Sequence, residues 1–209
     1  MGSLENSQFD YIIFGFGLTG QSAFKYLKLN GYRVAIINSG EVSSWATQDI
    51  DKDLCFSQED PQVFKVLKSA EAVVLSPGIP RSIDLLQRFS GPIINDIELF
   101  YKFKTTNSKI VGVTGSNGKT TVVTLLSKIL EASGRRVFCG GNIGRSPMEY
   151  LLNGESEDVI VLELSSFQLE SINSFCPDMA AIINIKMTHE ERYESFKKYK
   201  EAKLRIVKN

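Results

Sequence analysis

The sequence has few cysteines, a single histidine and no excess of either charge. Its 24 basic and 24 acidic residues cancel, so the overall charge does not point to nucleic acid or to an acidic membrane surface. No apolar run is long enough to span a bilayer, and the N-terminal residues lack the charged-then-apolar order of a signal peptide. These absences argue against nucleic-acid and membrane partners and favour a globular protein.

The three cysteines, Cys55, Cys139 and Cys176, are far apart and form no CxxC pair. A disulfide framework or a zinc site is therefore not expected. Free thiols are typical of a reducing compartment, so we expect a cytoplasmic protein.

What the sequence does contain is an alternation of apolar strands and helices, which predicts an α/β fold with parallel sheets. In the first part we expect a strand at 11–14, a helix at 22–29, and strands at 33–37 and 72–75, with a further strand and helix after residue 91. The polar segment 102–109 is the expected linker. Beyond it we expect strands at 110–114, 136–139, 158–164 and 180–185, and helices at 120–133 and 194–208.

The first glycine motif, "GFGLTG" at 15–20, follows a strand and precedes a helix. Its glycines permit a tight turn and let a phosphate approach the N–H groups that begin the helix. The alternative is a turn that only packs the helix closely against the sheet. A dinucleotide site would also need an acidic residue after the second strand, but Asn38 and Ser39 stand there, which favours another diphosphate over NAD.

The second motif, "TGSNGKTT" at 114–121, is the strongest local signal for phosphate. Its backbone N–H groups can surround phosphate oxygens, its lysine adds a positive charge, and the hydroxyl that follows can bind Mg²⁺. The usual phosphate loop has a glycine where Val113 stands, so this is a shorter form of that loop.

Three further side chains are candidates with open alternatives. Glu163 ends an apolar strand, where it is a metal ligand, a base, or a capping or ion-paired residue. His189 follows another strand, and a lone histidine is more often a surface or core residue. Lys203 lies in an apolar helical row with Phe196, Tyr199 and Ile206. Three interpretations fit that row. The aliphatic part of Lys203 can lie on the core with its charge at the surface, Lys203 can be buried or modified, or nearby Lys200 can be the residue with a role.

Seven stretches resemble the Mur ligases of bacterial cell-wall synthesis, in the same order and over nearly the whole chain. They are "GFGLTG", "SPGI", "NDIELF", "GVTGSNGKTT", "GGNIG", "VLELSSFQLE" and "YKEAKLRI". "GSNGKTT" is similar in folylpolyglutamate synthases as well, whereas "ELSSFQLE" and "DIELF" resemble the branch that adds D-glutamate. The resemblance implies a Rossmann-like domain at 1–104 that binds a UDP substrate, then the first part of an ATP-binding phosphate-loop domain at 105–209.

The same resemblance implies an ATP- and Mg²⁺-dependent ligase of peptidoglycan synthesis, monomeric in its complete form. Its partners would be UDP-N-acetylmuramoyl-L-alanine, D-glutamate and ATP. A substrate carboxylate would take the γ-phosphoryl group, and the amine of D-glutamate would attack the acyl phosphate. Because two anions must meet in the first step, Mg²⁺ and a lysine are needed to neutralise their repulsion.

The residues that the resemblance assigns fall into four groups. The ATP-binding group is Gly115, Ser116, Asn117, Gly118, Lys119, Thr120 and Thr121. The catalytic group is Lys119, Glu163, His189 and Lys203, and the metal ligands are Thr120, Glu163, His189 and Lys203 as a carbamate. The substrate-binding group is Leu18, Thr19, Ser39, Ser76, Pro77, Asn142 and Ser165. A carbamate would explain a lysine in an apolar row, because it turns a buried cation into an anion that binds Mg²⁺.

The sequence also departs from the family. Where members carry a segment of the type N-x-x-x-D-H-x-D-R, this chain reads "NIKMTHEERY", with Thr188 and Glu191 in place of aspartates. The spacing from His189 to Lys203 is shorter by a residue. Members also have three domains, so we expect a truncated form that exposes a strand edge and is inactive alone.

Two other functions remain open. A kinase-type phosphate-loop enzyme would explain the loop and Glu163 but not the "GFGLTG" unit. A non-catalytic nucleotide-binding module would fit the short length. An NAD-binding domain fits least well, because Asn38 occupies the acidic position.

Overall fold

The computed structural model describes residues 9–46, 50–154, 157–188 and 192–207. The chain divides into two compact units, Met1–Asp96 and Ile97–Asn209, which are considered one at a time. The domain boundary at residue 104 stays a prediction. The helix that precedes it, α5 (Asp96–Phe103), belongs to the second unit from its second residue, Ile97, onward. No helix in the described ranges has the length and apolarity needed to cross a membrane.

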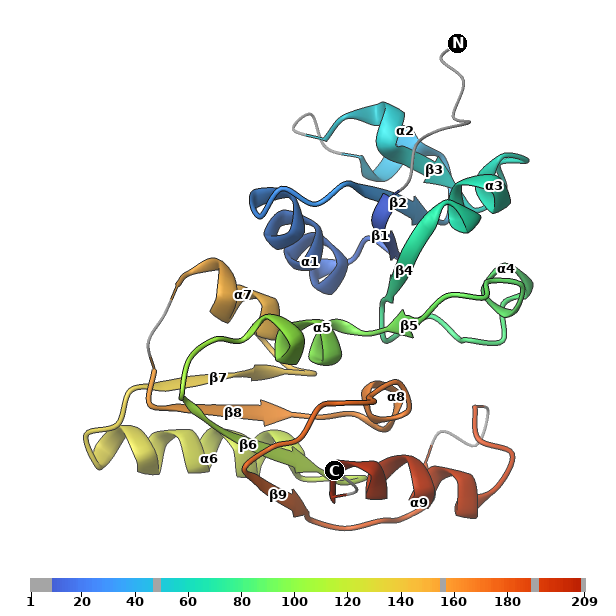
Figure 1. Ribbon diagram of the computed structural model, residues 1–209. Coiled ribbons are helices and arrows are strands. Elements are labelled where there is room, and N and C mark those ends of the chain that lie inside the picture. Colours follow the sequence, from blue (N-terminus) through green and yellow to red (C-terminus); the bar gives the residue numbers. More distant parts are fainter. Residues whose placement is uncertain (1–8, 47–49, 155–156, 189–191, 208–209) are drawn as a thin grey trace. The chain divides into compact units, whose positions relative to one another are not determined.

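The first unit is a parallel sheet with strand order β3-β2-β1-β4-β5 (Figure 1). Its elements are β1 (Phe9–Phe14), α1 (Leu18–Leu29), β2 (Val34–Asn38), α2 (Val42–Trp45), β3 (Cys55–Ser57), α3 (Val63–Lys68), β4 (Ala70–Leu75), α4 (Asp84–Gln87) and β5 (Ile93–Ile94). The strands expected from apolar runs are present at β1, β2 and β4. β3 has only three residues, too few for a period to be recognised in the sequence.

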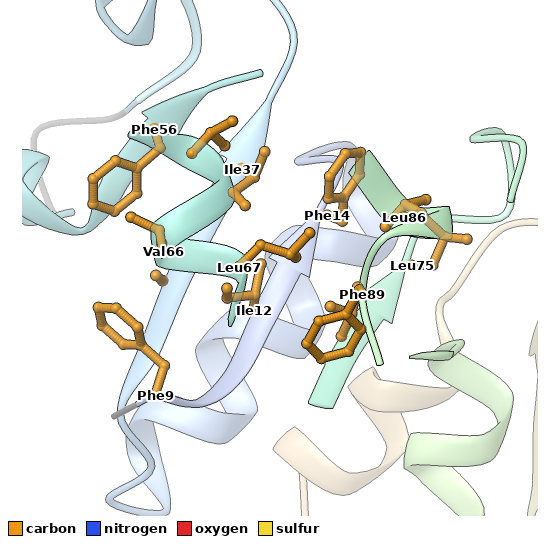
Figure 2. Close-up of a cluster of buried hydrophobic side chains, with 13 residues drawn as sticks. Phe9, Ile12, Phe14, Ile37, Phe56, Val66, Leu67, Leu75, Leu86 and Phe89 are labelled. Carbon is orange, nitrogen blue, oxygen red and sulfur yellow. The ribbon is translucent and has the colours of Figure 1, made fainter. Parts of the chain in front are cut away.

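The core of this unit lies on the central strand. Ile12, Ile13 and Phe14 of β1 are all fully buried, as expected for a parallel sheet covered on both faces. Figure 2 shows Ile12 and Phe14 within a cluster that also contains Leu67 of α3 and Leu75 of β4. Because β1 is fixed in this way, the glycine turn that follows it has a rigid base.

The second unit is a parallel sheet with strand order β7-β8-β6-β9. After α5 its elements are β6 (Lys109–Thr114), α6 (Lys119–Ala132), β7 (Val137–Gly141), α7 (Pro147–Leu152), β8 (Val159–Glu163), α8 (Ser166–Leu169), β9 (Met179–Ile182) and α9 (Phe196–Leu204). In the described part of the sheet β9 is an edge strand, and Met179, Ala180 and Ala181 are exposed on it. The fold class predicted from the sequence, parallel α/β, is thus confirmed.

Two helices of the second unit end or begin where local chemistry dictates. α6 is followed by Gly134 with φ +86°, the left-handed conformation typical of a helix end. α9 was expected from residue 194 but begins at Phe196, because the Ser195 side chain accepts the N–H of Lys198 and caps it. It ends at Leu204 and continues as a 3₁₀ turn, Arg205–Val207, rather than as the expected α-helix.

Glu98 of α5 ties two distant segments of the second unit together. Its carboxylate accepts the backbone N–H groups of Asn173, Ser174 and Phe175 over 2.7–3.1 Å, and also the Ser174 hydroxyl. Burial opposes ionisation, but these hydrogen bonds outweigh it, so the pKa of Glu98 lies below its ordinary value. The carboxylate therefore fixes the segment after α8 against α5.

We expect Glu98→Gln to lower the free energy of unfolding by about 1–3 kcal/mol at pH 7, because an amide replaces the charged acceptor of these N–H groups. The folded-state pKa of Glu98 is depressed, so its stabilisation is present above the unfolded pKa of about 4.3. It is lost as the pH falls through the folded pKa. Urea denaturation followed by circular dichroism should therefore show the gap between the two proteins narrowing at acidic pH.

Glu201→Gln is the matched control, because Glu201 is exposed on α9. Its unfolding should match that of the parent at every pH. A Glu98→Gln protein as stable as the parent at pH 7 would contradict the role given to this carboxylate.

Candidate functional site

The loop between β6 and α6 has the geometry of an anion-binding turn. Gly118 is the N-cap of α6 with φ +80°, a conformation that favours glycine. The first N–H groups of a helix have no acceptor within it, and the positive end of its dipole favours an anion. The loop is therefore suited to receive phosphate oxygens at Gly118 and the residues that follow it.

Two lysine side chains meet at one carbonyl oxygen of this loop. The Nζ of Lys119 donates to the oxygen of Gly115 over 3.0 Å and to that of Ser116 over 3.2 Å. The Nζ of Lys203, from α9, donates to the same Gly115 oxygen over 2.9 Å. The amines of Lys119 and Lys203 are thus both held beside the turn.

Glu163 ends β8 beside the loop and is only 2% exposed. Its Oε2 accepts the hydroxyl of Thr120 over 2.8 Å, and its Oε1 accepts the side-chain amide of Asn142 over 3.0 Å. Both donors are neutral. Because a buried carboxylate is costly without compensation, this arrangement is suited to a cation.

The oxygen atoms at this point fit Mg²⁺, which takes carboxylate and hydroxyl oxygens together with phosphate and water. Glu163 and Thr120 would hold it. Within the described ranges no three side chains of His, Cys, Asp or Glu gather at one place, so a nucleotide and water would have to supply the remaining ligands. Of the other two expected ligands, His189 lies outside the described residues, and Lys203 was expected as a carbamate.

Lys203 is buried, with 2% of its surface exposed, whereas Lys200 on the same helix is exposed. Of the two lysines near the apolar row, Lys203 is therefore the buried one. Burial is the main cause that lowers the pKa of its amine; the Tyr199 hydroxyl opposes this shift, and the Lys119 ammonium adds to it. The neutral amine is thus favoured more than in an exposed lysine.

The segment after β9 runs along the loop and is bonded to it. The side chain of Asn184 accepts the N–H groups of Ser116 and Asn117, each over 3.1 Å. The Ser116 hydroxyl lies 2.8 Å from the Tyr199 hydroxyl, which also lies 2.8 Å from that of Thr188. Sequence reasoning missed Asn184. It lies two residues after the end of β9, a strand next to β6, and a polar residue at a strand end is the same signal that singled out Glu163.

The glycine turn of the first unit is closely packed. A Cβ on Gly20 would lie 2.2 Å from the oxygen of Gly15, so only glycine lets α1 approach the turn this closely. The Ser76 hydroxyl donates to the same Gly15 oxygen over 2.9 Å. The side-chain oxygen of Asn38 accepts the N–H of Phe16 over 3.1 Å. Asn38 therefore orders the turn, at the position where a dinucleotide site would hold a ribose.

The structure places the expected substrate residues on separate units. In the first unit, Leu18 and Thr19 begin α1, and 79% of Leu18 is exposed. Ser39 follows β2, and Ser76 and Pro77 follow β4. In the second unit, Asn142 contacts Glu163, and Ser165 caps α8 by accepting the N–H of Gln168. The second unit thus brings together Lys119, Thr120, Glu163 and Lys203 around one loop.

Comparison with known protein families gives matches over both units. The family described as Mur ligase MurD-like, N-terminal domain, matches residues 9–94, and the Mur ligase middle domain matches residues 113–209. Two solved structures show the same fold. The first is a UDP-N-acetylmuramate:L-alanyl-gamma-D-glutamyl-meso-diaminopimelate ligase from Neisseria meningitides, which is 17% identical with a TM-score of 0.56; the match covers 97% of this chain and 68% of that one. The second is a UDP-N-acetylmuramate-alanine ligase from Thermotoga maritima, which is 20% identical with a TM-score of 0.54; the match covers 97% of this chain and 47% of that one.

Curated relatives are more similar in sequence. UDP-N-acetylmuramoylalanine–D-glutamate ligase from Geobacter metallireducens is 36% identical over 99% of this chain and 46% of its own length. The protein of the same name from Wolbachia pipientis is 37% identical over 93% of this chain and 38% of its own length. The chain thus spans less than half the length of these relatives. Taken with the two domain matches, these similarities make the chain a member of the Mur ligase family that carries its N-terminal and middle domains.

Proposed function

We propose that this chain provides the UDP-substrate-binding and ATP-binding parts of a ligase that adds D-glutamate to UDP-N-acetylmuramoyl-L-alanine. The observation that carries the proposal is the buried Glu163 carboxylate, held by the hydroxyl of Thr120 beside a glycine loop with a lysine. The names of the relatives that match nearly the whole chain support the choice of substrates. Cys55, Cys139 and Cys176 form no disulfide within the described residues, which accords with a cytoplasmic enzyme.

The loop and the start of α6 would bind the phosphates of ATP. The N–H groups from Gly118 onward would face the phosphate oxygens, and Lys119 would turn from the Gly115 carbonyl to the bound anion. Mg²⁺ would neutralise phosphate charge and orient the γ-phosphoryl group. Glu163 would hold the Thr120 hydroxyl in a position where the hydroxyl oxygen and the carboxylate oxygen can both bind Mg²⁺.

The proposed reaction has two steps. The carboxylate of UDP-N-acetylmuramoyl-L-alanine attacks the γ-phosphorus of ATP, and the bond from this phosphorus to the β-γ bridging oxygen breaks. The products of this step are an acyl phosphate and ADP. The neutral amine of D-glutamate then attacks the acyl carbon, phosphate leaves, and the nitrogen loses a proton to give the amide. Lys119 assists the first step, in which two anions approach each other, because a fixed cation lowers that repulsion.

The first test titrates the chain with Mg·ATP by calorimetry. We expect the parent to bind, and both Glu163→Gln and Lys119→Met to bind on the order of tenfold or more weakly, since each removes a charged contact. Glu131→Gln, an exposed acid on α6, serves as the control and should bind like the parent. Unchanged affinity in Glu163→Gln would overturn the cation site.

The second test titrates the chain with UDP-N-acetylmuramoyl-L-alanine and, separately, with NAD. We expect binding of the first ligand, weakened about tenfold by Thr19→Ala, and no binding of NAD, because Asn38 stands where a ribose-binding acid is needed. Binding of Mg·ATP without binding of the UDP ligand would instead favour the kinase-type phosphate-loop alternative.

The third test concerns Lys203, for which we propose a carbamate. The neutral amine adds to CO₂, forming a C–N bond and releasing a proton, and the product is an anion that can bind Mg²⁺. In ¹³C-labelled bicarbonate the parent should show a carbamate signal by NMR. The signal should be absent from Lys203→Met and retained in Lys200→Met, whose residue is exposed on the same helix. A signal that survives Lys203→Met would refute this assignment.

A further inference from the structure

Asn184 joins the segment after β9 to the phosphate loop through both the oxygen and the nitrogen of its side-chain amide. Its Oδ1 accepts the N–H of Ser116 and the N–H of Asn117, each over 3.1 Å. Its Nδ2 donates to the carbonyl oxygen of Asn117 over 3.0 Å. The backbone oxygen of Asn184 also accepts the Ser116 N–H over 3.1 Å. One side chain thus binds both the N–H and the C=O of Asn117.

Only an amide offers this combination at this size. The two loop N–H groups need an acceptor, and the Asn117 carbonyl needs a donor, and the asparagine side chain carries one of each on the same carbon. A carboxylate would keep the acceptor but would face the carbonyl without a donor. An aliphatic side chain would offer neither.

A second attachment fixes the same part of the loop. The hydroxyl of Ser116 donates to the backbone oxygen of Lys186 over 2.7 Å and accepts the Lys186 N–H over 2.8 Å. Residues 184–186 therefore lie along residues 116 and 117 much as a short strand would. Two N–H groups of the loop are consequently directed at the protein itself rather than at a ligand.

We propose that Asn184 is a positioning residue that holds the loop in its phosphate-binding shape and divides it into two parts. Ser116 and Asn117 turn their N–H groups to Asn184, and the phosphates are received by N–H groups from Gly118 onward. Asn117 would then reach a ligand only through its exposed side chain. The inference deepens the proposed function and rests on it for the identity of the ligand, but not for the loop geometry.

The loop geometry is tested first in the free chain, by amide hydrogen exchange measured by NMR. In Asn184→Ala we expect the Asn117 N–H to exchange about tenfold faster or more, because the side-chain oxygen that accepts it is gone. The Ser116 N–H keeps the backbone oxygen of residue 184 as an acceptor, so its exchange should change less. In Asn184→Asp the acceptor remains, so exchange at these two positions should stay closer to that of the parent. Exchange in Asn184→Ala equal to that of the parent would overturn the proposal.

Binding of Mg·ATP by the same proteins tests the functional part. We expect Asn184→Ala to bind about tenfold more weakly than the parent, with an unchanged midpoint of urea unfolding. Asn184→Asp should lose at least as much affinity despite its protected loop, because its carboxylate adds negative charge beside the phosphates. Exposed Asn153, at the end of α7, supplies the control Asn153→Ala, which should bind like the parent.

The outcomes separate this inference from the proposed function. If the parent does not bind Mg·ATP, the proposed function fails, and the exchange data alone decide whether Asn184 holds the loop. If the parent binds and Asn184→Ala binds equally well, the positioning role fails while the proposed function stands. If Asn184→Ala binds Mg·ATP more weakly but also unfolds at a lower urea concentration, the positioning role fails as well, because general destabilisation then explains the loss of affinity.

Discussion

The described strands of the second unit all run parallel, and the site depends on this constraint. Parallel strands end at the same edge of a sheet, so whatever follows each strand is brought to one place. β6 lies between β8 and β9, in a register that pairs Val113 with Glu163 and Thr114 with Ile182. The phosphate loop after β6, the carboxylate that ends β8 and the amide after β9 therefore meet, although Thr120 and Glu163 are separated by 43 positions in the chain.

Two buried carboxylates, Glu98 and Glu163, have opposite surroundings. Glu98 accepts three backbone N–H groups and a hydroxyl, which depress its pKa and use its capacity as an acceptor within the fold. Glu163 is more deeply buried, and among the described residues its side-chain donors are the neutral groups of Thr120 and Asn142. The first arrangement is complete without a ligand, whereas the second leaves a negative charge that a cation can satisfy.

Much of this could be predicted from the sequence, where the signal is local. The glycine loop and Glu163 were found because a strand precedes each of them, and the fold class followed from the alternation of elements. The helical period of α9 could not choose between Lys200 and Lys203, because the two differ by a small rotation, and it wrongly included Phe196, which is 47% exposed. The contact of Asn142 with Glu163 depends on the turn at Gly141 with φ +108°, whose conformation no period encodes.

The distance along the chain between the loop and the residue that holds it has a consequence for folding. Asn117 and Asn184 are 67 positions apart, and contacts between such distant residues form late, because a long loop must close first. The glycine loop and α6 can therefore assemble well before β9 pairs with β6 and brings Asn184 into place. During synthesis the N-terminal segments are also made first. Competence to bind phosphate would then appear only as β9 docks on β6, so nucleotide binding would report that these two strands have paired.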